Sequence, residues 1–291
     1  MIVIPQKLFN DTQVSIILRD GNICVLQKEL PVSVKQREGY VASHAISFVQ
    51  SGEQIINFYN GEEVRIKAKE LVIIPRGVYY ISDLISSGEQ FKSLLFYFDD
   101  DIIHQFLSSL NHSEYQRKAT SQHLLINNSP NLNTFCTSLI SIYKNSSYQQ
   151  SALAAIKILE LLHLLHQNNK DLIAFLFQLT LPQKRNIKSF MQKNFDKPLK
   201  IEDYAYLTGR SESTFRRDFK SAFEITPQKW LKVKRIEKAL SILKNKEISV
   251  TELAFEVGYE NISYFIKEFK KETGETPKQY ILSKHKNHLQ L

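Results

Sequence analysis

The chain has 291 residues, of which 43% are hydrophobic and 23% are charged. This composition is ordinary for a globular protein, and the length is comfortable for two domains. The longest uncharged apolar runs, at residues 71–75 and 94–98, are far too short to cross a bilayer, so no membrane segment is expected. Two cysteines, Cys24 and Cys136, exclude a disulfide framework and a four-thiolate zinc site. With no signal-peptide pattern, these features predict a cytoplasmic protein.

The charge is unevenly distributed along the chain. Residues 183–291 contain 23 lysines and arginines against 14 acidic residues, whereas residues 1–182 contain 15 against 16. A nearly neutral first part is therefore joined to a strongly basic last part. This asymmetry indicates that the last hundred residues meet a polyanion, although charge alone does not separate nucleic acid from an anionic membrane.

Eight short runs rich in β-branched and aromatic residues predict strands in the first hundred residues. The runs cover residues 14–18, 22–27, 45–49, 54–59, 63–67, 71–75, 78–82 and 91–98. Turn signals such as Asp20-Gly21 and Asn60-Gly61 separate them. Because the turns are short, we expect neighbours along the chain to pair antiparallel in a sandwich or small barrel.

Three consecutive aspartates at 99–101 mark a change to helical spacing. Apolar residues recur at helical intervals from Ile102 onward, and a second helix is predicted over residues 132–143. The aspartates could be metal ligands, or they could begin the helix, whose N-terminal dipole favours carboxylates. No other ligand clusters nearby in the sequence, which favours the helix start.

A third predicted helix, over residues 151–167, is apolar on most of its sides and must be buried on most of them. Its partner is either a second subunit or the ordinary core of its own domain, and the pattern leaves both open. The candidate dimerisation residues are Ile158, Leu161, Leu162 and Leu165. His163 and His166 on the same helix lack a visible third metal ligand. The polar stretch that follows and Pro182 predict a domain boundary near residue 182.

The last hundred residues contain a repeat with a period of about 50. Six residues recur at a spacing of 50 and three more at 49. The first set is Phe215, Phe219, Lys220, Thr226, Pro227 and Trp230, which recur as Phe265, Phe269, Lys270, Thr276, Pro277 and Tyr280. Ile201, Ala205 and Gly209 recur as Val250, Ala254 and Gly258.

Each repeat predicts a helix, a glycine turn and a second helix. Gly209 and Gly258 permit the left-handed conformation that ends the first helix. Ser211 and Asn261 are suited to cap the second. One long helix, over residues 227–243, joins the two repeats.

The second helix of each repeat is basic on the side opposite its phenylalanines. The predicted outer faces are Ser213, Arg216, Arg217 and Lys220 in the first repeat, and Ser263, Ile266, Lys267 and Lys270 in the second. A solvated charged surface is the usual explanation for one such helix. Two equivalent basic helices behind tight turns favour a pair of DNA recognition helices.

Residues 183–283 resemble the DNA-binding domain of the AraC/XylS family of bacterial transcription regulators, most closely over residues 248–280. The resemblance implies that each recognition helix enters a major groove, with the two grooves one turn apart. It places base contacts on Ser213, Arg216 and Arg217, and on Ile262, Ser263, Ile266 and Lys267. Lysine at 267 lacks the bidentate fork of the arginine that is frequent there, so base discrimination in the second helix would rest on methyl contacts or be weak.

The layout of the first 182 residues is similar to the family's usual companion domain. The predicted fold class is therefore α+β multidomain. Residues 1–110 form an antiparallel, cupin-like β-barrel that binds an effector or partner, residues 111–182 form helices for dimerisation and a linker, and residues 183–291 form the all-α DNA-binding domain. The resemblance further implies a homodimer, double-stranded operator DNA and RNA polymerase as partners, and a small-molecule or protein effector.

The predicted function is a sequence-specific DNA-binding transcription regulator that acts as an activator, with no catalytic residue, cofactor or metal. One alternative is a cupin-type metalloenzyme with a basic appendage. It needs clustered ligands, and residues 1–110 hold only His44 and His104. A DNA-repair methyl acceptor would need an activated cysteine, and neither cysteine has a basic neighbour within two positions.

Overall fold

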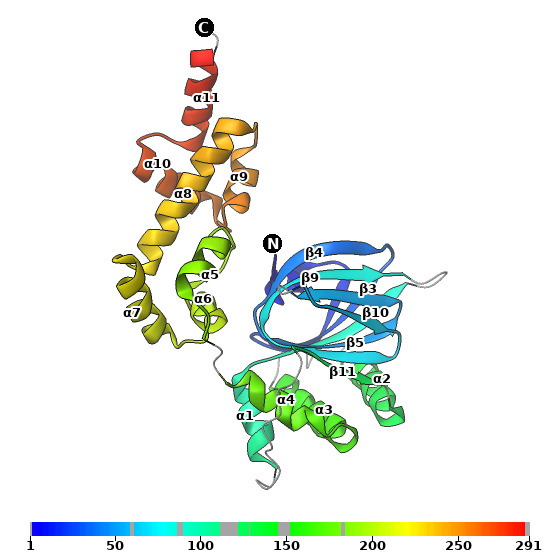
Figure 1. Cartoon of the computed structure of the whole chain (residues 1–291). Helices are drawn as coiled ribbons and strands as arrows, with labels where there is room; N and C mark the ends of the chain where they lie inside the picture. Colours follow the sequence, from blue (N-terminus) through cyan, green and yellow to red (C-terminus); the bar gives the residue numbers. More distant parts are fainter. Residues whose placement is uncertain are drawn as a thin grey trace. The chain divides into compact units, whose positions relative to one another are not determined.

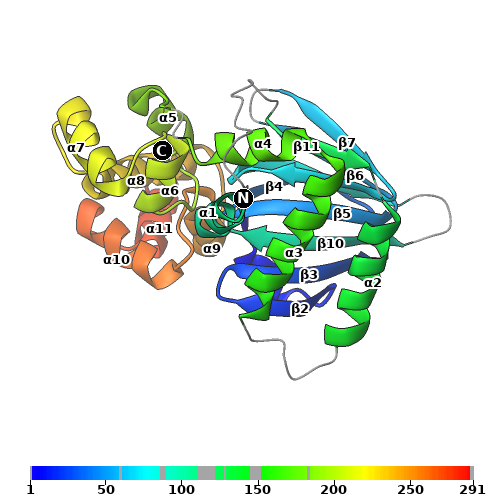
Figure 2. The same cartoon turned by 90° about the horizontal axis from the view of Figure 1, so that it is seen from below.

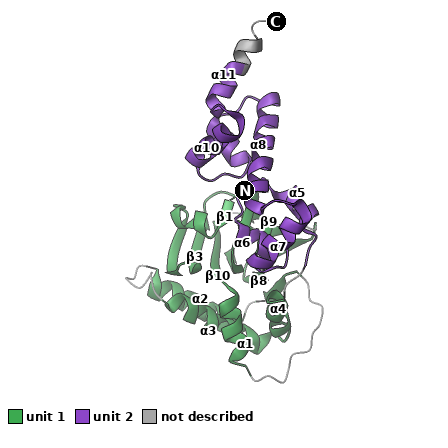
Figure 3. Ribbon diagram, turned by 90° about the vertical axis from the view of Figure 1, so that its left-hand side faces the viewer, with its two compact units in different colours: residues 1–181 green, residues 182–291 purple. Residues whose placement is uncertain are grey.

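The computed structural model describes residues 2–58, 61–85, 90–110, 122–127, 129–144, 152–181 and 184–288. The chain divides into two compact units, residues 1–181 and 182–291 (Figure 3). The predicted boundary residue Pro182 lies outside the described ranges. Within those ranges, no helix is long and apolar enough to span a membrane.

The described part of the first unit contains two β-sheets. One has five strands in the order β1 (Ile2–Ile4), β4 (Val34–Val41), β9 (Gly77–Leu84), β6 (Glu53–Phe58) and β7 (Glu63–Lys67). The other has six, in the order β11 (Leu124–Asn127), β8 (Glu70–Ile74), β5 (His44–Ser51), β10 (Phe91–Phe98), β3 (Ile23–Leu30) and β2 (Val14–Asp20). A short 3-10 helix, η1 (Gln6–Asn10), follows β1. The expected antiparallel, sheet-rich first domain is confirmed, with the exception of the parallel β1–β4 pair.

Strand pairing follows chain order less often than the short turns predict. The hairpins β2–β3 and β6–β7 are confirmed. The expected pairs β5–β6, β7–β8 and β8–β9 are wrong, because in each case the chain crosses from one sheet to the other. At the first crossing Gly52 has φ +84°, and a Cβ there would lie 2.5 Å from the carbonyl oxygen of Leu84. These turns are therefore corners of a sandwich rather than hairpin loops.

Four helices cover the outer face of the six-stranded sheet, and Figure 2 shows α2 and α3 lying across its strands. They are α1 (Asp100–Ser108), α2 (Pro130–Tyr143), α3 (Leu153–Asn168) and α4 (Asp171–Leu179). The Asp99 carboxylate accepts a hydrogen bond from the backbone N–H of Ile102, so the aspartates begin a helix as predicted. Helix α4 was expected to be part of the link between domains. Its Leu172, Phe175 and Leu176 instead belong to the core of the first unit.

The six-stranded sheet has an apolar core on each face. One core lies between the two sheets and the other between the sheet and the helices. This double burial explains why β5 is buried from His44 to Val49 without the alternation of a one-sided strand.

Helix α3 packs its apolar side into the core of this layer. Ile158, Leu161 and Leu162 have no exposed surface and Leu165 is 4% exposed. The interpretation of these four side chains as a dimer interface is therefore wrong, because the core of their own chain already covers them. His163 and His166 both pack against the ring of Phe106 on α1.

The second unit is helical throughout its described part (Figure 1). Its helices are α5 (Ile187–Asn194), α6 (Ile201–Leu207), α7 (Glu212–Phe223), α8 (Pro227–Asn245), α9 (Val250–Glu256), α10 (Ile262–Thr273) and α11 (Pro277–His288). Helices α6 and α7 form one helix-turn-helix unit and α9 and α10 the other, with α8 between them, as the repeat predicts. The flanking helices α5 and α11 were not predicted.

We expect Leu161→Ala to lower the free energy of unfolding of the first unit by about 2–5 kcal/mol, because it leaves a cavity in a closed core. Ile156→Ala on the same helix is the matched control. Ile156 is 54% exposed, and its truncation should cost well under about 1 kcal/mol. Urea unfolding followed by circular dichroism measures both. Equal effects of the two substitutions would contradict the assignment of Leu161 to the core.

Candidate nucleic-acid interface

The two repeats place equivalent helices, α7 and α10, behind equivalent turns. Gly209 has φ +69° and Gly258 φ +89°, the left-handed conformation predicted for both. The Ser211 hydroxyl accepts a hydrogen bond from the N–H of Thr214 at 3.3 Å, and the Asn261 side chain accepts one from Tyr264 at 2.9 Å. Both predicted caps are confirmed, so the start of each second helix is determined locally.

The inner faces of α7 and α10 bury matching pairs of phenylalanines. Phe215, Phe219, Phe265 and Phe269 have no exposed surface. Phe219 also packs against Phe223 and against Trp230 of α8. Because these contacts fix the rotation of each helix, the residues on the opposite side face outward.

The outward face of α7 carries the basic residues expected of it. Ser213, Arg217 and Lys220 are exposed, and the Arg216 side chain is half exposed. Arg216 Nη2 lies 2.5 Å from Glu212 Oε1 one turn earlier, whereas Arg217 Nη2 lies 3.4 Å from Asp218. The more exposed and less tightly paired Arg217 is therefore the easier of the two arginines to redirect toward a ligand.

Asp218 ties the start of the turn to α7. Arg210 Nε donates to Asp218 Oδ2 at 3.0 Å, and Arg210 Nη1 donates to the carbonyls of Arg185 and Thr208. The hydrogen bond from Arg210 lowers the pKa of the Asp218 carboxyl below its usual value. Arg210 is thus a structural cation, while Arg217 lies on the outer side of α7.

The outward face of α10 differs from that of α7. Ser263, Lys267 and Lys270 are exposed, but Ile262 and Ile266 are half buried against the core of the second repeat. Only part of each isoleucine side chain is therefore open to a base. Tyr264 is 51% exposed on this helix and was missed by the sequence analysis, which assigned it no role.

A buried ion pair holds α10 against the linking helix. Glu268 is 6% exposed and pairs with Lys232 of α8. The hydrogen bond with the Glu268 carboxylate raises the pKa of the Lys232 ammonium. The position of Glu268 corresponds to that of Asp218 in the first repeat, 50 residues earlier, so both repeats anchor the same helical position with a cation from a neighbouring element.

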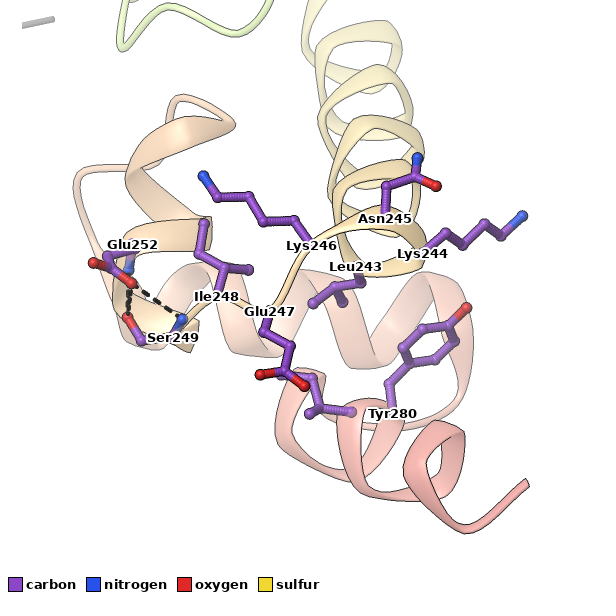
Figure 4. Close-up of a pocket in the computed structure, with 10 residues that line it drawn as sticks. Leu243, Lys244, Asn245, Lys246, Glu247, Ile248, Ser249, Glu252 and Tyr280 are labelled. Carbon is purple, nitrogen blue, oxygen red and sulfur yellow. Dashed lines mark hydrogen bonds between the residues drawn. The ribbon is translucent and has the colours of Figure 1, made fainter. Parts of the chain in front are cut away.

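An open groove of about 810 Å³ lies where α8 ends and α9 begins (Figure 4). Leu243, Ile248 and Tyr280 contribute apolar surface, with Lys246 and Glu252 at the sides. Glu252 caps α9 through the backbone N–H and hydroxyl of Ser249. The ten lining residues include two lysines and two glutamates, so the groove favours neither charge.

The first unit holds a small polar site between its sheets. Lys28 and Asp83 form an ion pair inside the sandwich, and Gln54 Nε2 donates to Asp83 Oδ1 at 2.7 Å. Ser47 Oγ and Gln54 Oε1 line the same cavity with no hydrogen-bond partner among the described residues. The cavity measures about 40 Å³, which is room for a few water molecules and not for a sugar.

Neither cysteine is placed as a nucleophile, since burial raises the pKa of both Cys24 and Cys136 to about 12. Among the described residues, no three of His, Cys, Asp and Glu cluster as metal ligands would. We expect both thiols to resist a thiol-specific chromogenic reagent in the native protein and to react once it is unfolded in guanidinium. A thiol that reacts rapidly in the folded state would contradict this burial.

For the basic face of α7, we expect Arg216→Ala and Arg217→Ala each to weaken DNA binding. Loss of a base contact should cost about 1–3 kcal/mol and relax preference at one base pair. Loss of a phosphate contact should weaken binding to all sequences alike. It should also lower, by about one, the slope of the logarithm of the binding constant against the logarithm of the salt concentration. Lys193→Ala, an exposed charge on α5, is the control. Unchanged binding by the folded double variant would remove α7 from the interface.

Comparisons with known proteins place both units in one family. Residues 44–175 match the model of the ExsA N-terminal regulatory domain, and residues 204–282 match a helix-turn-helix domain. The virulence regulon transcriptional activator VirF of Yersinia enterocolitica is 33% identical over 188 residues, which cover 62% of this chain and 68% of VirF. The HTH-type transcriptional regulator ExsA of Pseudomonas aeruginosa is 31% identical over 127 residues, 43% of this chain and 46% of ExsA. A crystal structure of apo ToxT from Vibrio cholerae aligns with 91% of this chain and 98% of its own, with a TM-score of 0.46 and 13% identity.

The match to VirF covers more than two thirds of the length of that protein. The match to the helix-turn-helix domain falls on the two repeats described above. The chain therefore belongs to the AraC family and is a DNA-binding transcription regulator with an N-terminal regulatory domain.

Proposed function

We propose that this regulator activates transcription by inserting α7 and α10 into successive major grooves of a promoter operator. The observation that carries the proposal is the pair of equivalent helices, each turned by buried phenylalanines so that its polar and basic side faces outward. The proposed DNA contacts are Ser213, Arg216, Arg217 and Lys220 on α7, and Ile262, Ser263, Ile266, Lys267 and Lys270 on α10. Activation rather than repression is inferred from relatives such as VirF, which is named as an activator.

In this proposal the two helices contribute differently to sequence preference and to affinity. Helix α7 offers two guanidinium groups, which can form bidentate contacts with guanine. Helix α10 offers Lys267 and Lys270 as point charges and two isoleucines that are only half exposed. Sequence preference is therefore expected to be stronger in the half-site that meets α7, and affinity in the other half-site to depend more on phosphate contacts.

We further propose that residues 1–110 receive an effector or partner, that residues 111–182 supply helices and a linker, and that residues 183–291 bind DNA. The cavity of about 40 Å³ beside Lys28 and Asp83 is too small for a sugar, so an effector of that size would bind at another place on the first unit. We also propose that the protein forms a homodimer and contacts RNA polymerase in the cytoplasm. The family membership of the chain supports both of these proposals. Any dimer surface must be built from residues other than the four buried side chains of α3, Ile158, Leu161, Leu162 and Leu165.

The division of labour predicts that residues 183–291 fold alone and bind DNA. The fragment has 109 residues, enough for an independent core, and its net charge of +9 predicts nonspecific affinity that falls steeply with salt. It should bind a specific site more weakly than the full chain, because tethering two such fragments raises their effective concentration.

Gel-shift titration of the fragment and the full chain at two salt concentrations measures both affinities. A folded fragment without DNA affinity at low salt would overturn the assignment of DNA binding to this part. Equal affinity of the two forms would remove the case for a dimerising first unit. Transcription in a purified system with RNA polymerase and the bound promoter distinguishes an activator from a repressor.

A further inference from the structure

The two helix-turn-helix units share one continuous element, helix α8. Its first turns pack on the first repeat, where Trp230 meets Phe219 and Phe223. Its last turns pack on the second repeat, where Ile236 and Leu243 join the core around Phe265. Figure 1 shows α8 running between the two repeats. Long helices curve rather than run straight, so contacts beside α8 add to what determines the angle between α7 and α10.

A second connection runs beside the middle of α8. It is made by the 195–199 loop, which joins α5 to α6 in the first repeat. Arg235 Nε donates to the carbonyl of Phe195 at 2.8 Å, and Arg235 Nη2 donates to the carbonyl of Lys197 at 2.6 Å. The same guanidinium lies 5.5 Å from the ring centre of Tyr259, at the turn of the second repeat. One side chain of α8 therefore contacts both repeats.

Lys238, one turn further along α8, makes a parallel contact. Its Nζ lies 2.5 Å from Asp196 Oδ2 and 3.5 Å from the carbonyl oxygen of Glu256, the last residue of α9. Both side chains of this ion pair are largely buried. The pair thus joins the 195–199 loop to the end of α9 as well as to α8.

The backbone of the loop also packs directly on the turn of the second repeat. A Cβ added to Gly258 would lie 2.6 Å from the carbonyl oxygen of Asp196 and 3.0 Å from that of Lys197. Glycine at 258 is thus required twice, by its φ of +89° and by this close approach.

The loop is equally well held by its own repeat. The buried Tyr204 of α6 donates its hydroxyl to the carbonyl of Asn194 at 2.8 Å, with the carbonyl of Lys197 at 3.4 Å. A displacement of the loop would therefore displace the first repeat with it.

We propose that Arg235, Lys238 and Gly258, acting on the 195–199 loop, form a brace that fixes the distance and angle between α7 and α10. The brace makes this regulator selective for one spacing between its two half-sites. The inference rests on the proposed function, because it takes α7 and α10 as recognition helices. One added base pair turns the second half-site by about 34° and moves it by about 3.4 Å, a change that a braced pair of helices cannot follow.

The test begins with selection of binding sites by the full-length protein from a library of random DNA duplexes. The wild type is expected to enrich a two-part site with a single spacing. Arg235→Ala is expected to enrich the same two parts with spacings that spread by one base pair or more. Arg235→Lys keeps the charge but loses the planar fork that reaches two carbonyls, so it should also broaden the spacing.

A titration on designed duplexes gives the magnitude. The enriched wild-type site is compared with the same site carrying one inserted base pair between its two parts. We expect the insertion to weaken wild-type binding at least about tenfold and to weaken Arg235→Ala binding about twofold or less. Lys234→Ala is the matched control. Lys234 is the neighbouring cation on α8, and its ion-pair partner Glu237 lies on the same helix. Removing the Lys234 side chain should therefore leave the effect of the inserted base pair unchanged.

Each outcome bears on one of the two proposals. A wild type that enriches no two-part site overturns the assignment of two recognition helices in the proposed function. A wild type with one spacing that the folded Arg235→Ala and Arg235→Lys variants share overturns the brace alone. If circular dichroism shows that Arg235→Ala loses helix, it is replaced under the same criterion by Lys238→Gln, which removes the ion pair with Asp196 and the contact with the Glu256 carbonyl.

Discussion

The burial of two phenylalanines on one face of each recognition helix is the constraint on which the DNA-binding unit depends. Phe215 and Phe219 in α7, and Phe265 and Phe269 in α10, are fully buried. Removing such large apolar surfaces from water is the main driving force for packing a short helix against its neighbours. Once these side chains are inside, the rotation of each helix is set, and the basic side must face outward.

Electrostatics then distinguishes structural charges from available ones. Arg210, Lys232 and Arg235 are bound to acidic groups or carbonyls inside the unit and hold its parts together. Arg217 and Lys267 are exposed on the outer faces. The net charge of +9 already subtracts the acidic partners of Arg210 and Lys232, whereas Arg235 is held by neutral carbonyls and is one unit of that charge that is not free to meet DNA.

The first unit is organised around its six-stranded sheet, which has a hydrophobic core on each face. Strands such as β5 are buried on both faces, and helix α3 is covered by α1, α2, α4 and the sheet. The buried apolar side chains of these elements therefore pack within the first unit. Inside the sandwich, the cavity beside the buried pair of Lys28 and Asp83 measures about 40 Å³.

Local sequence was sufficient for most features of the DNA-binding unit. The caps at Ser211 and Asn261, the left-handed turns at Gly209 and Gly258 and the inner phenylalanines each have a local sequence pattern, so periodicity and capping rules predicted them. The same holds for the hairpins β2–β3 and β6–β7, whose turns determine their pairing. The family resemblance added the functional meaning of the outer faces, and the match to a helix-turn-helix domain agrees with it.

Tertiary structure decided whatever depends on residues far apart in the chain. The short turns between β5 and β6 and between β8 and β9 look like hairpin turns in sequence, yet the two cores draw these strands into different sheets. An apolar helix has the same pattern whether a second subunit or its own domain covers it, so only the fold showed that Leu161 and its neighbours are core. The contacts of Arg235 with carbonyls about 40 residues earlier have no sequence signature, because any backbone carbonyl can accept a hydrogen bond and only folding brings those two within reach.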